Sequence, residues 1–136
     1  MSPPIDWEPL VEAALAAQQR AYAPYSRFPV GAALLMEDGS VVAGCNVENR
    51  SFGLTVCAER NAVTTAVALG RTLPQAAVVV TGTSPPSPPC GMCLESLAEF
   101  AREMPILLVN PAGERVESRL EELLPCRFEW SGPHGD

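Results

Sequence analysis

The fold is decided by residues 57–93, CAERNAVTTAVALGRTLPQAAVVVTGTSPPSPPCGMC. Cys57 to Leu69 reads as a buried helix rich in Ala and Val, closed by Gly70. Ala76 to Thr81 is a β-branched apolar run and predicts a buried strand. A loop with four prolines follows, and a second helix is expected from Gly91 to Arg102. The stretch therefore predicts a helix–strand–helix unit whose two helices each begin beside a cysteine.

Upstream of this unit, the sequence predicts a helix and a hairpin. Asp6 is a plausible N-cap and Pro9 suits a first helical turn, so we expect a helix from there to Tyr22. Apolar runs from Val30 to Met36 and from Val41 to Cys45 flank the turn signal Glu37-Asp38-Gly39-Ser40. Polar residues 46–55 are expected to form a loop.

Downstream, Ile106 to Val109 predicts another strand, and Arg115 to Glu117 is expected to pair with it across a turn. Ser118 and Glu121 match a capping box for a last short helix to Leu124, and the tail after about residue 130 is expected to be disordered. Strands that alternate with helices indicate an α/β fold, with a mixed sheet covered by helices. The length of 136 residues suits one domain over 1–136.

Composition limits the classes of partner. Nine basic and sixteen acidic residues give a net charge of −7, which disfavours a nucleic acid polymer and favours a small neutral or cationic ligand. No apolar run is long enough for a membrane span, and the N-terminus does not resemble a signal peptide, so we expect a cytoplasmic protein. Five cysteines, an odd number, argue against a disulfide framework in that compartment.

Three cysteines and one glutamate make a candidate catalytic metal site. Cys90 and Cys93 form a Cys-x-x-Cys pair at one predicted helix start, and Cys57 stands at another. Helix N-termini favour the thiolate forms that a metal requires. Three protein ligands leave the fourth tetrahedral position of Zn²⁺ for water, and Glu59 can lie beside that water without being a ligand.

Spacing alone leaves other interpretations open. The Cys-x-x-Cys pair could be a redox motif, or a closed structural zinc site could recruit Cys45 or Cys126 as a fourth ligand. Glu59 could be an ordinary solvated helix residue. His134 is the only histidine and lies in a tail rich in Pro and Gly, so we do not expect it to bind metal.

The Cys-x-Glu and Pro-Cys-x-x-Cys motifs, with the residues around them, resemble the small homotetrameric zinc-dependent cytidine deaminases. The similarity runs from about Ala21 to Phe128. It includes the motifs AYAPYS (21–26), FPVGAAL (28–34), GCNVEN (44–49), GLTVCAER (53–60) and LLP (123–125).

The resemblance implies a three-layer cytidine deaminase-like fold with a mixed five-stranded sheet flanked by helices. It implies one Zn²⁺ per subunit, held by Cys57, Cys90 and Cys93, with Glu59 as proton shuttle. The implied reaction is hydrolytic deamination of cytidine and 2′-deoxycytidine through zinc-bound hydroxide, in pyrimidine salvage. The implied substrate-binding residues begin with Phe28, which packs in the nucleoside pocket. Asn46 and Glu48 would hydrogen-bond the ribose 3′-hydroxyl, and the backbone of Ala58 would contact the base. Phe128 would stack on the pyrimidine bound by a neighbouring subunit of the homotetramer.

Charge balance adds Arg60 to the predicted site. Zn²⁺ with three thiolates carries net −1, which opposes deprotonation of a bound water, and a cation nearby would offset this. Arg60 follows Glu59 and is expected to donate to the thiolate sulfurs; the alternative is that it only forms a surface ion pair.

Four positions depart from the family pattern. Leu94 and Glu95 stand where relatives usually have Arg and Gln, while Arg50 and Phe52 stand where they have a small residue and often Tyr. Arg50 leaves open the deamination of a modified or 5′-substituted cytosine nucleoside, and blasticidin-type deaminases share the zinc motif. From a different class, the chain could be a non-catalytic, zinc-stabilised assembly protein.

Overall fold

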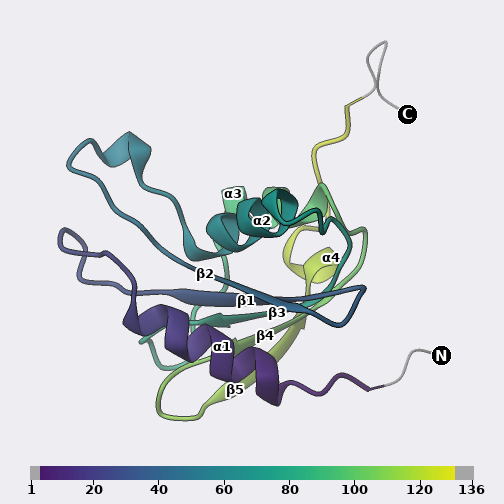
Figure 1. Cartoon of the computed structure of the whole chain (residues 1–136), viewed down its shortest axis with the longest axis horizontal. Helices are drawn as coiled ribbons and strands as arrows, with labels where there is room; N and C mark the ends of the chain where they lie inside the picture. Colours follow the sequence, from purple (N-terminus) through teal and green to yellow (C-terminus); the bar gives the residue numbers. More distant parts are fainter. Residues whose placement is uncertain (1–3, 131–136) are drawn as a thin grey trace.

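A mixed five-stranded sheet organises the chain in the computed structural model, which describes residues 4–130 (Figure 1). The strand order is β2-β1-β3-β4-β5, and only the β3–β4 pair is parallel. This confirms the predicted α/β fold. The elements in chain order are α1 (Glu8–Gln19), β1 (Gly31–Met36), β2 (Val41–Cys45), the 3₁₀ turn η1 (Phe52–Leu54), α2 (Ala58–Ala68), β3 (Pro74–Val80), α3 (Gly91–Ala98), β4 (Pro105–Val109), β5 (Arg115–Arg119) and α4 (Leu120–Leu123).

Both faces of the sheet are apolar because helices cover both. On one face, α1 packs Leu10, Val11 and Ala14 against alternate residues of β1, β3 and β4. On the other face, α2, α3 and α4 pack against the intervening residues, including Val79 and Ile106. Continuous apolar strands such as Val78 to Val80 are typical of a sheet buried on both sides.

Two glycines let helices approach the sheet closely. A Cβ built on Gly44 of β2 would lie 2.4 Å from the Ala62 nitrogen and 2.6 Å from the Ala58 oxygen. A Cβ on Gly31 would lie 2.0 Å from the Ala14 oxygen. Any side chain at Gly44 would therefore push the first turn of α2 away from the sheet.

The strand register brings four separate segments to one edge of the sheet. Gly31, the first residue of β1, lies opposite both Cys45, the last residue of β2, and Val80, the last residue of β3. The residues before β1, after β2 and after β3 consequently meet at this edge. Val47, after β2, also pairs with Val56, just before α2, so the start of α2 lies at the same edge.

The first helix is shorter than predicted and is capped differently. It ends at Gln19 rather than Tyr22, because Tyr22 instead forms a β-bridge with Val47. Trp7 occupies the N-cap position without a side-chain bond. The Asp6 carboxylate accepts a hydrogen bond from the Glu8 nitrogen at 3.3 Å, so the prediction of Asp6 as N-cap was wrong by one position.

Two predictions after β3 also need correction. Helix α3 ends at Ala98 rather than Arg102, since the chain must turn to bury Met104 and begin β4. No capping box forms at α4, whose N-cap is Arg119. Ser118 donates its hydroxyl to the Ile106 oxygen, and Glu121 accepts from the Met104 nitrogen, so both side chains bond to neighbouring segments.

Two sequence expectations concern residues beyond those described. The predicted disorder after residue 130 and the exclusion of His134 as a ligand both fall in 131–136, outside the described residues. Among residues 4–130, no helix has the length and apolarity needed to cross a membrane.

Candidate active site

Three cysteine sulfurs converge at the sheet edge where β3 ends. The Sγ atoms of Cys57, Cys90 and Cys93 all lie within 4.8 Å of one another, and those of Cys90 and Cys93 are 3.4 Å apart. Among the described residues 4–130, neither Cys45 nor Cys126 belongs to this group of three thiols, which argues against a closed site with four cysteines.

Helix starts hold all three thiols. Cys57 is the N-cap of α2, Cys90 is the N-cap of α3, and Cys93 lies in the first turn of α3. Although burial opposes ionisation of Cys90, the backbone N–H of Cys93, the thiols of Cys93 and Cys57 and the N–H of Met92 together lower its pKa. For Cys57 and Cys93, burial and neighbouring negative groups, including Glu59, raise the pKa.

The donor set fits a zinc ion. A tetrahedral Zn²⁺ with bonds of 2.3 Å places its sulfur ligands about 3.8 Å apart, a spacing close to that of this cluster. A divalent cation also favours the thiolates that crowding opposes at Cys57 and Cys93. Arg60 gives a second indication of a metal site, because one of its donors is available to the thiolates. Its Nη2 donates to the Thr55 oxygen at 3.1 Å, but its buried Nε has no hydrogen-bond partner in residues 4–130.

Glu59 lies beside the thiols in the first turn of α2. Its side chain is only 5% exposed, which rules out the reading as a solvated helix residue. Burial raises the pKa of Glu59, while its own backbone N–H, the Cys93 thiol and the Arg60 charge act in the opposite direction. A buried carboxyl group without a bidentate cationic partner is suited to exchanging protons.

A cavity of about 250 Å³ opens over the thiols and Glu59. Five of the six predicted substrate and proton-transfer residues line it together: Phe28, Asn46, Glu48, Ala58 and Glu59. The sixth, Phe128, is not part of the lining and is 73% exposed near the C-terminus. The cavity thus collects residues that are up to 67 positions apart in sequence, from Ser26 to Cys93.

Asn46 and Glu48 also hold the loop that carries Phe28. The Asn46 side chain donates to the Phe28 oxygen at 2.9 Å and accepts from the Val30 nitrogen at 2.8 Å. Glu48 accepts from the backbone nitrogens of Tyr25 and Ser26 at 2.9 and 3.0 Å, and from the Ser26 hydroxyl. The Ser26 hydroxyl and these backbone N–H groups lower the pKa of Glu48, so it is a carboxylate at neutral pH.

Sequence reasoning missed several polar residues of this cavity. Ser26, Thr55, Thr81 and Ser87 line it, and Ser87 lies in the proline-rich loop between β3 and α3. The Ser87 nitrogen donates to the Thr81 hydroxyl at 2.9 Å, which ties this loop to the end of β3. The one usable sequence signal was Thr81, a polar residue that ends an apolar strand.

The departures from the family pattern lie in different surroundings. Leu94 is buried in the core with α2 and α3. Arg50 and Phe52 are exposed in the loop before α2, and the Phe52 ring contacts the Tyr25 ring edge-on at 5.8 Å. Glu95 accepts a hydrogen bond from the backbone nitrogen of Phe128.

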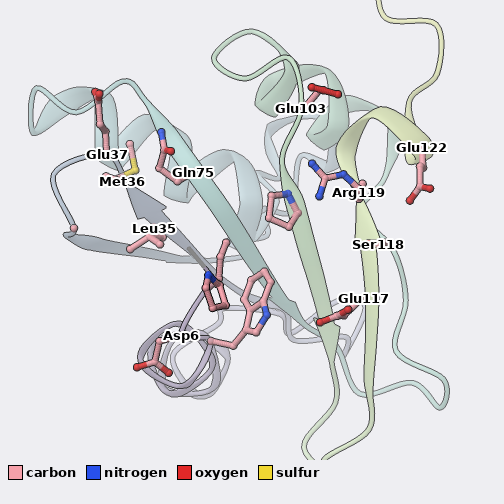
Figure 2. A pocket seen from close by; sticks show the side chains of 15 residues that line it. Asp6, Leu35, Met36, Glu37, Gln75, Glu103, Glu117, Ser118, Arg119 and Glu122 are labelled. Atoms are coloured by element: carbon pink, nitrogen blue, oxygen red, sulfur yellow. The ribbon is translucent and has the colours of Figure 1, made fainter. Parts of the chain in front are cut away.

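A larger cavity lies on the α1 face of the sheet, beside β5 (Figure 2). Its volume is about 1190 Å³, and its lining is rich in carboxylates from Asp6, Glu37, Glu103, Glu117 and Glu122. No cysteine lines it, and it contains no residue of the thiol cluster. The smaller cavity is therefore lined by the candidate metal ligands and is the candidate active site.

Comparisons with known proteins agree with this geometry. Residues 6–108 match the family model described as "Cytidine and deoxycytidylate deaminase zinc-binding region". The chain is 47% identical to a cytidine deaminase from Halalkalibacterium halodurans over 91% of this chain and 95% of the relative, and 44% identical to one from Mycobacterium tuberculosis over 93% and 92%. A crystal structure of cytidine deaminase from Burkholderia pseudomallei superposes with a TM-score of 0.87 at 43% identity, covering 91% of this chain and all of that one. The chain belongs to the zinc-binding cytidine and deoxycytidylate deaminase family.

Proposed function

We propose that this protein deaminates cytidine and 2′-deoxycytidine hydrolytically, giving uridine and 2′-deoxyuridine with release of ammonia. The observation that carries the proposal is the thiol cluster of Cys57, Cys90 and Cys93 next to buried Glu59, at the base of a cavity that also contains Phe28, Asn46 and Glu48. A bound zinc ion supplies Lewis acidity and lowers the pKa of a water molecule.

Glu59 moves the protons of this reaction. It accepts a proton from the attacking water and delivers it to N3 of the cytosine, which makes C4 electrophilic. After the water oxygen has added to C4, Glu59 takes the remaining proton from this hydroxyl and passes it to the amino group. The C4–N bond then breaks, ammonia leaves, and the oxygen stays on C4 as the carbonyl of uridine. Its burial excludes bulk water from these transfers.

The nucleoside is held by the cavity lining. Phe28 packs against it, and the first backbone N–H of α2, at Ala58, has no acceptor within the helix and is available to the base. Asn46 and Glu48 bind the ribose 3′-hydroxyl. Their contacts with the loop leave an amide N–H of Asn46 and carboxylate lone pairs of Glu48 available for this hydroxyl. Their contacts with the loop fix the pocket before the substrate arrives.

Assembly into a homotetramer completes the site with Phe128 of a neighbouring subunit. Large apolar side chains are exposed at Tyr22 and Val47, which form a β-bridge with each other, and at Phe52 and Leu54 in η1. Exposed apolar surface of this kind favours association with further subunits.

The reaction belongs to pyrimidine salvage in the cytoplasm.

The proposal is tested by the loss of cytidine ultraviolet absorbance when purified protein is added, with light scattering of the same preparation to measure its mass. We expect turnover of cytidine and deoxycytidine, a tetramer mass, and loss of activity with a strong chelator. Cytidine 5′-monophosphate and blasticidin serve as comparison substrates. Turnover of either one without turnover of cytidine, or no deamination at all, contradicts the proposal.

Arg60 is expected to stabilise the metal centre through its unpartnered Nε. Arg60→Gln removes the positive charge and should lower zinc content, or kcat by about tenfold, the loss typical of a residue that supports metal ligands. Zinc analysis and steady-state kinetics measure this effect, with Arg71→Gln as a matched surface control, since Arg71 pairs with Asp38 away from the thiols. Unchanged zinc content and rate in Arg60→Gln would show that Arg60 has no such role.

A further inference from the structure

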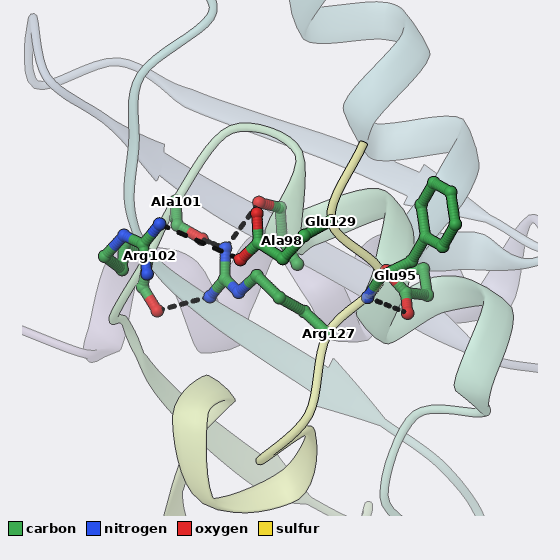
Figure 3. Close-up of polar contacts among 7 residues, drawn as sticks. Glu95, Ala98, Ala101, Arg102, Arg127 and Glu129 are labelled. Atoms are coloured by element: carbon green, nitrogen blue, oxygen red, sulfur yellow. Dashed lines mark hydrogen bonds and ion pairs between the residues drawn. The ribbon is translucent and has the colours of Figure 1, made fainter. Parts of the chain in front are cut away.

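The segment Arg127–Glu129, here called the C-terminal arm, is fastened to the end of α3 (Figure 3). The Arg127 guanidinium donates to the carbonyl oxygens of Ala98 at 2.8 Å, Ala101 at 3.1 Å and Arg102 at 2.5 Å. These carbonyls lie at or just beyond the helix end, where the backbone lacks intrahelical donors. Arg127 therefore caps α3 and anchors the arm in one step.

The backbone of Phe128 has its own attachment. Its nitrogen donates to Glu95 Oε2 at 3.0 Å, a bond between residues 33 positions apart on the arm and on α3 (Figure 3). Glu129 adds an exposed ion pair with Arg102 at 3.8 Å. The Phe128 ring, in contrast, is 73% exposed. Each residue of the arm is thus attached either to α3 or to the residues that directly follow it, while the aromatic ring stays exposed.

Because its backbone is attached and its ring is exposed, Phe128 is preorganised to bind the surface of a partner. If the arm were free, its residues would lose conformational entropy each time the ring bound, and binding would weaken accordingly. Helix α3 also begins with Cys90 and Cys93, so the arm is attached to the helix that carries two of the three metal ligands. The attachment therefore places the ring at a set position relative to its own subunit's site.

We propose that Glu95 is a positioning residue that fixes the Phe128 backbone, so that the ring enters the substrate cavity of a neighbouring subunit in a preformed orientation. The inference rests on the proposed function, in which Phe128 stacks on the pyrimidine. A carboxylate accepts an N–H bond more strongly than a neutral oxygen does, and a glutamine at this position keeps an acceptor oxygen. Glu95 thus gains a role although it departs from the family pattern.

The test compares Glu95→Ala with Glu95→Gln in the zinc-loaded enzyme. Glu95→Ala should raise KM for cytidine by about three- to tenfold with little change in kcat, because one charge-assisted hydrogen bond that supports substrate binding is lost. Glu95→Gln should stay within about twofold of the wild type, since its amide oxygen can accept the same bond. Glu99→Ala is the matched control: Glu99 is exposed one turn further along and forms no side-chain hydrogen bond within residues 4–130, so KM should not change.

A double variant and an exchange measurement complete the test. Phe128→Ala alone should raise KM, and adding Glu95→Ala should raise it no further, because both changes remove the same ring from the site. The Phe128 amide should exchange its hydrogen faster in Glu95→Ala than in Glu95→Gln.

Three results are distinguishable. Unchanged KM in Glu95→Ala with a raised KM in Phe128→Ala overturns the positioning role and leaves the proposed function intact. Loss of zinc or of the tetramer in Glu95→Ala assigns Glu95 a general structural role and also overturns the inference. An inactive wild type overturns the proposed function itself.

Discussion

Glu59→Gln is expected to yield a folded, zinc-loaded protein whose kcat for cytidine is lower by at least about 10²–10⁴-fold. Glutamine keeps the volume of the buried side chain, so the core around Ala58 and Ala62 should not collapse. It cannot accept and release protons, however, and both proton transfers of the proposed mechanism pass through this position. Glu59→Ala should be similarly inactive.

Steady-state kinetics, zinc analysis and thermal unfolding together check this prediction. The matched control is Glu99→Gln, an equal change at an exposed glutamate outside the cavity, which should keep wild-type kcat. A Glu59→Gln protein with more than about a tenth of wild-type kcat would exclude Glu59 as the proton shuttle. Loss of zinc from this variant would instead show that Glu59 maintains the metal centre.

Cys93→Ala is expected to abolish zinc binding and activity together. Cys93 is fully buried, and its sulfur lies 3.4 Å from that of Cys90, so no other thiol can replace it without moving α3. Removing one of three protein ligands leaves a site that competes poorly for zinc. Because metal binding contributes free energy to folding, the variant should also unfold at a lower temperature than the zinc-loaded wild type.

Zinc per chain, measured by elemental analysis, and Tm with and without chelator test this expectation. Cys126→Ala is the control, since Cys126 is exposed and lies outside the thiol group. It should retain about one zinc ion per chain, in line with a single site that has three protein ligands. Full zinc content in Cys93→Ala would show that the metal binds elsewhere than at this cluster. Equal losses in both cysteine variants would point to general instability rather than ligand removal.

Short-range patterns in the sequence were sufficient to predict most strands and the metal cluster. The runs around Leu34, Val79 and Leu107 are apolar at consecutive positions, and each became a strand buried on both faces. The thiol cluster could be predicted because Cys90 and Cys93 are only three positions apart, and because a helix start orients both toward one point. The structure brings Cys57 to them at the predicted start of the other helix.

Helix ends were harder to predict because competing contacts come from elsewhere in the chain. The pattern around Tyr22 suits a helix, but its backbone donates to Asn46 and accepts from Glu48 across more than 20 positions. The pair Ser118 and Glu121 has the spacing of a capping box, yet each side chain bonds to the β4 segment. Local propensity differences are small, so a few tertiary hydrogen bonds decide the outcome.

The sequence by itself determined the chemistry: which residues can bind a metal, which carboxyl group stands beside them, and which runs must be buried. These properties depend on residue type and on spacing within one helical turn or one strand. Only the tertiary structure decided that Asn46 and Glu48 also hold the Phe28 loop, and that Glu95 holds the Phe128 backbone from 33 positions away. Such contacts depend on where strands and helices place distant residues, and no local period in the sequence records that placement.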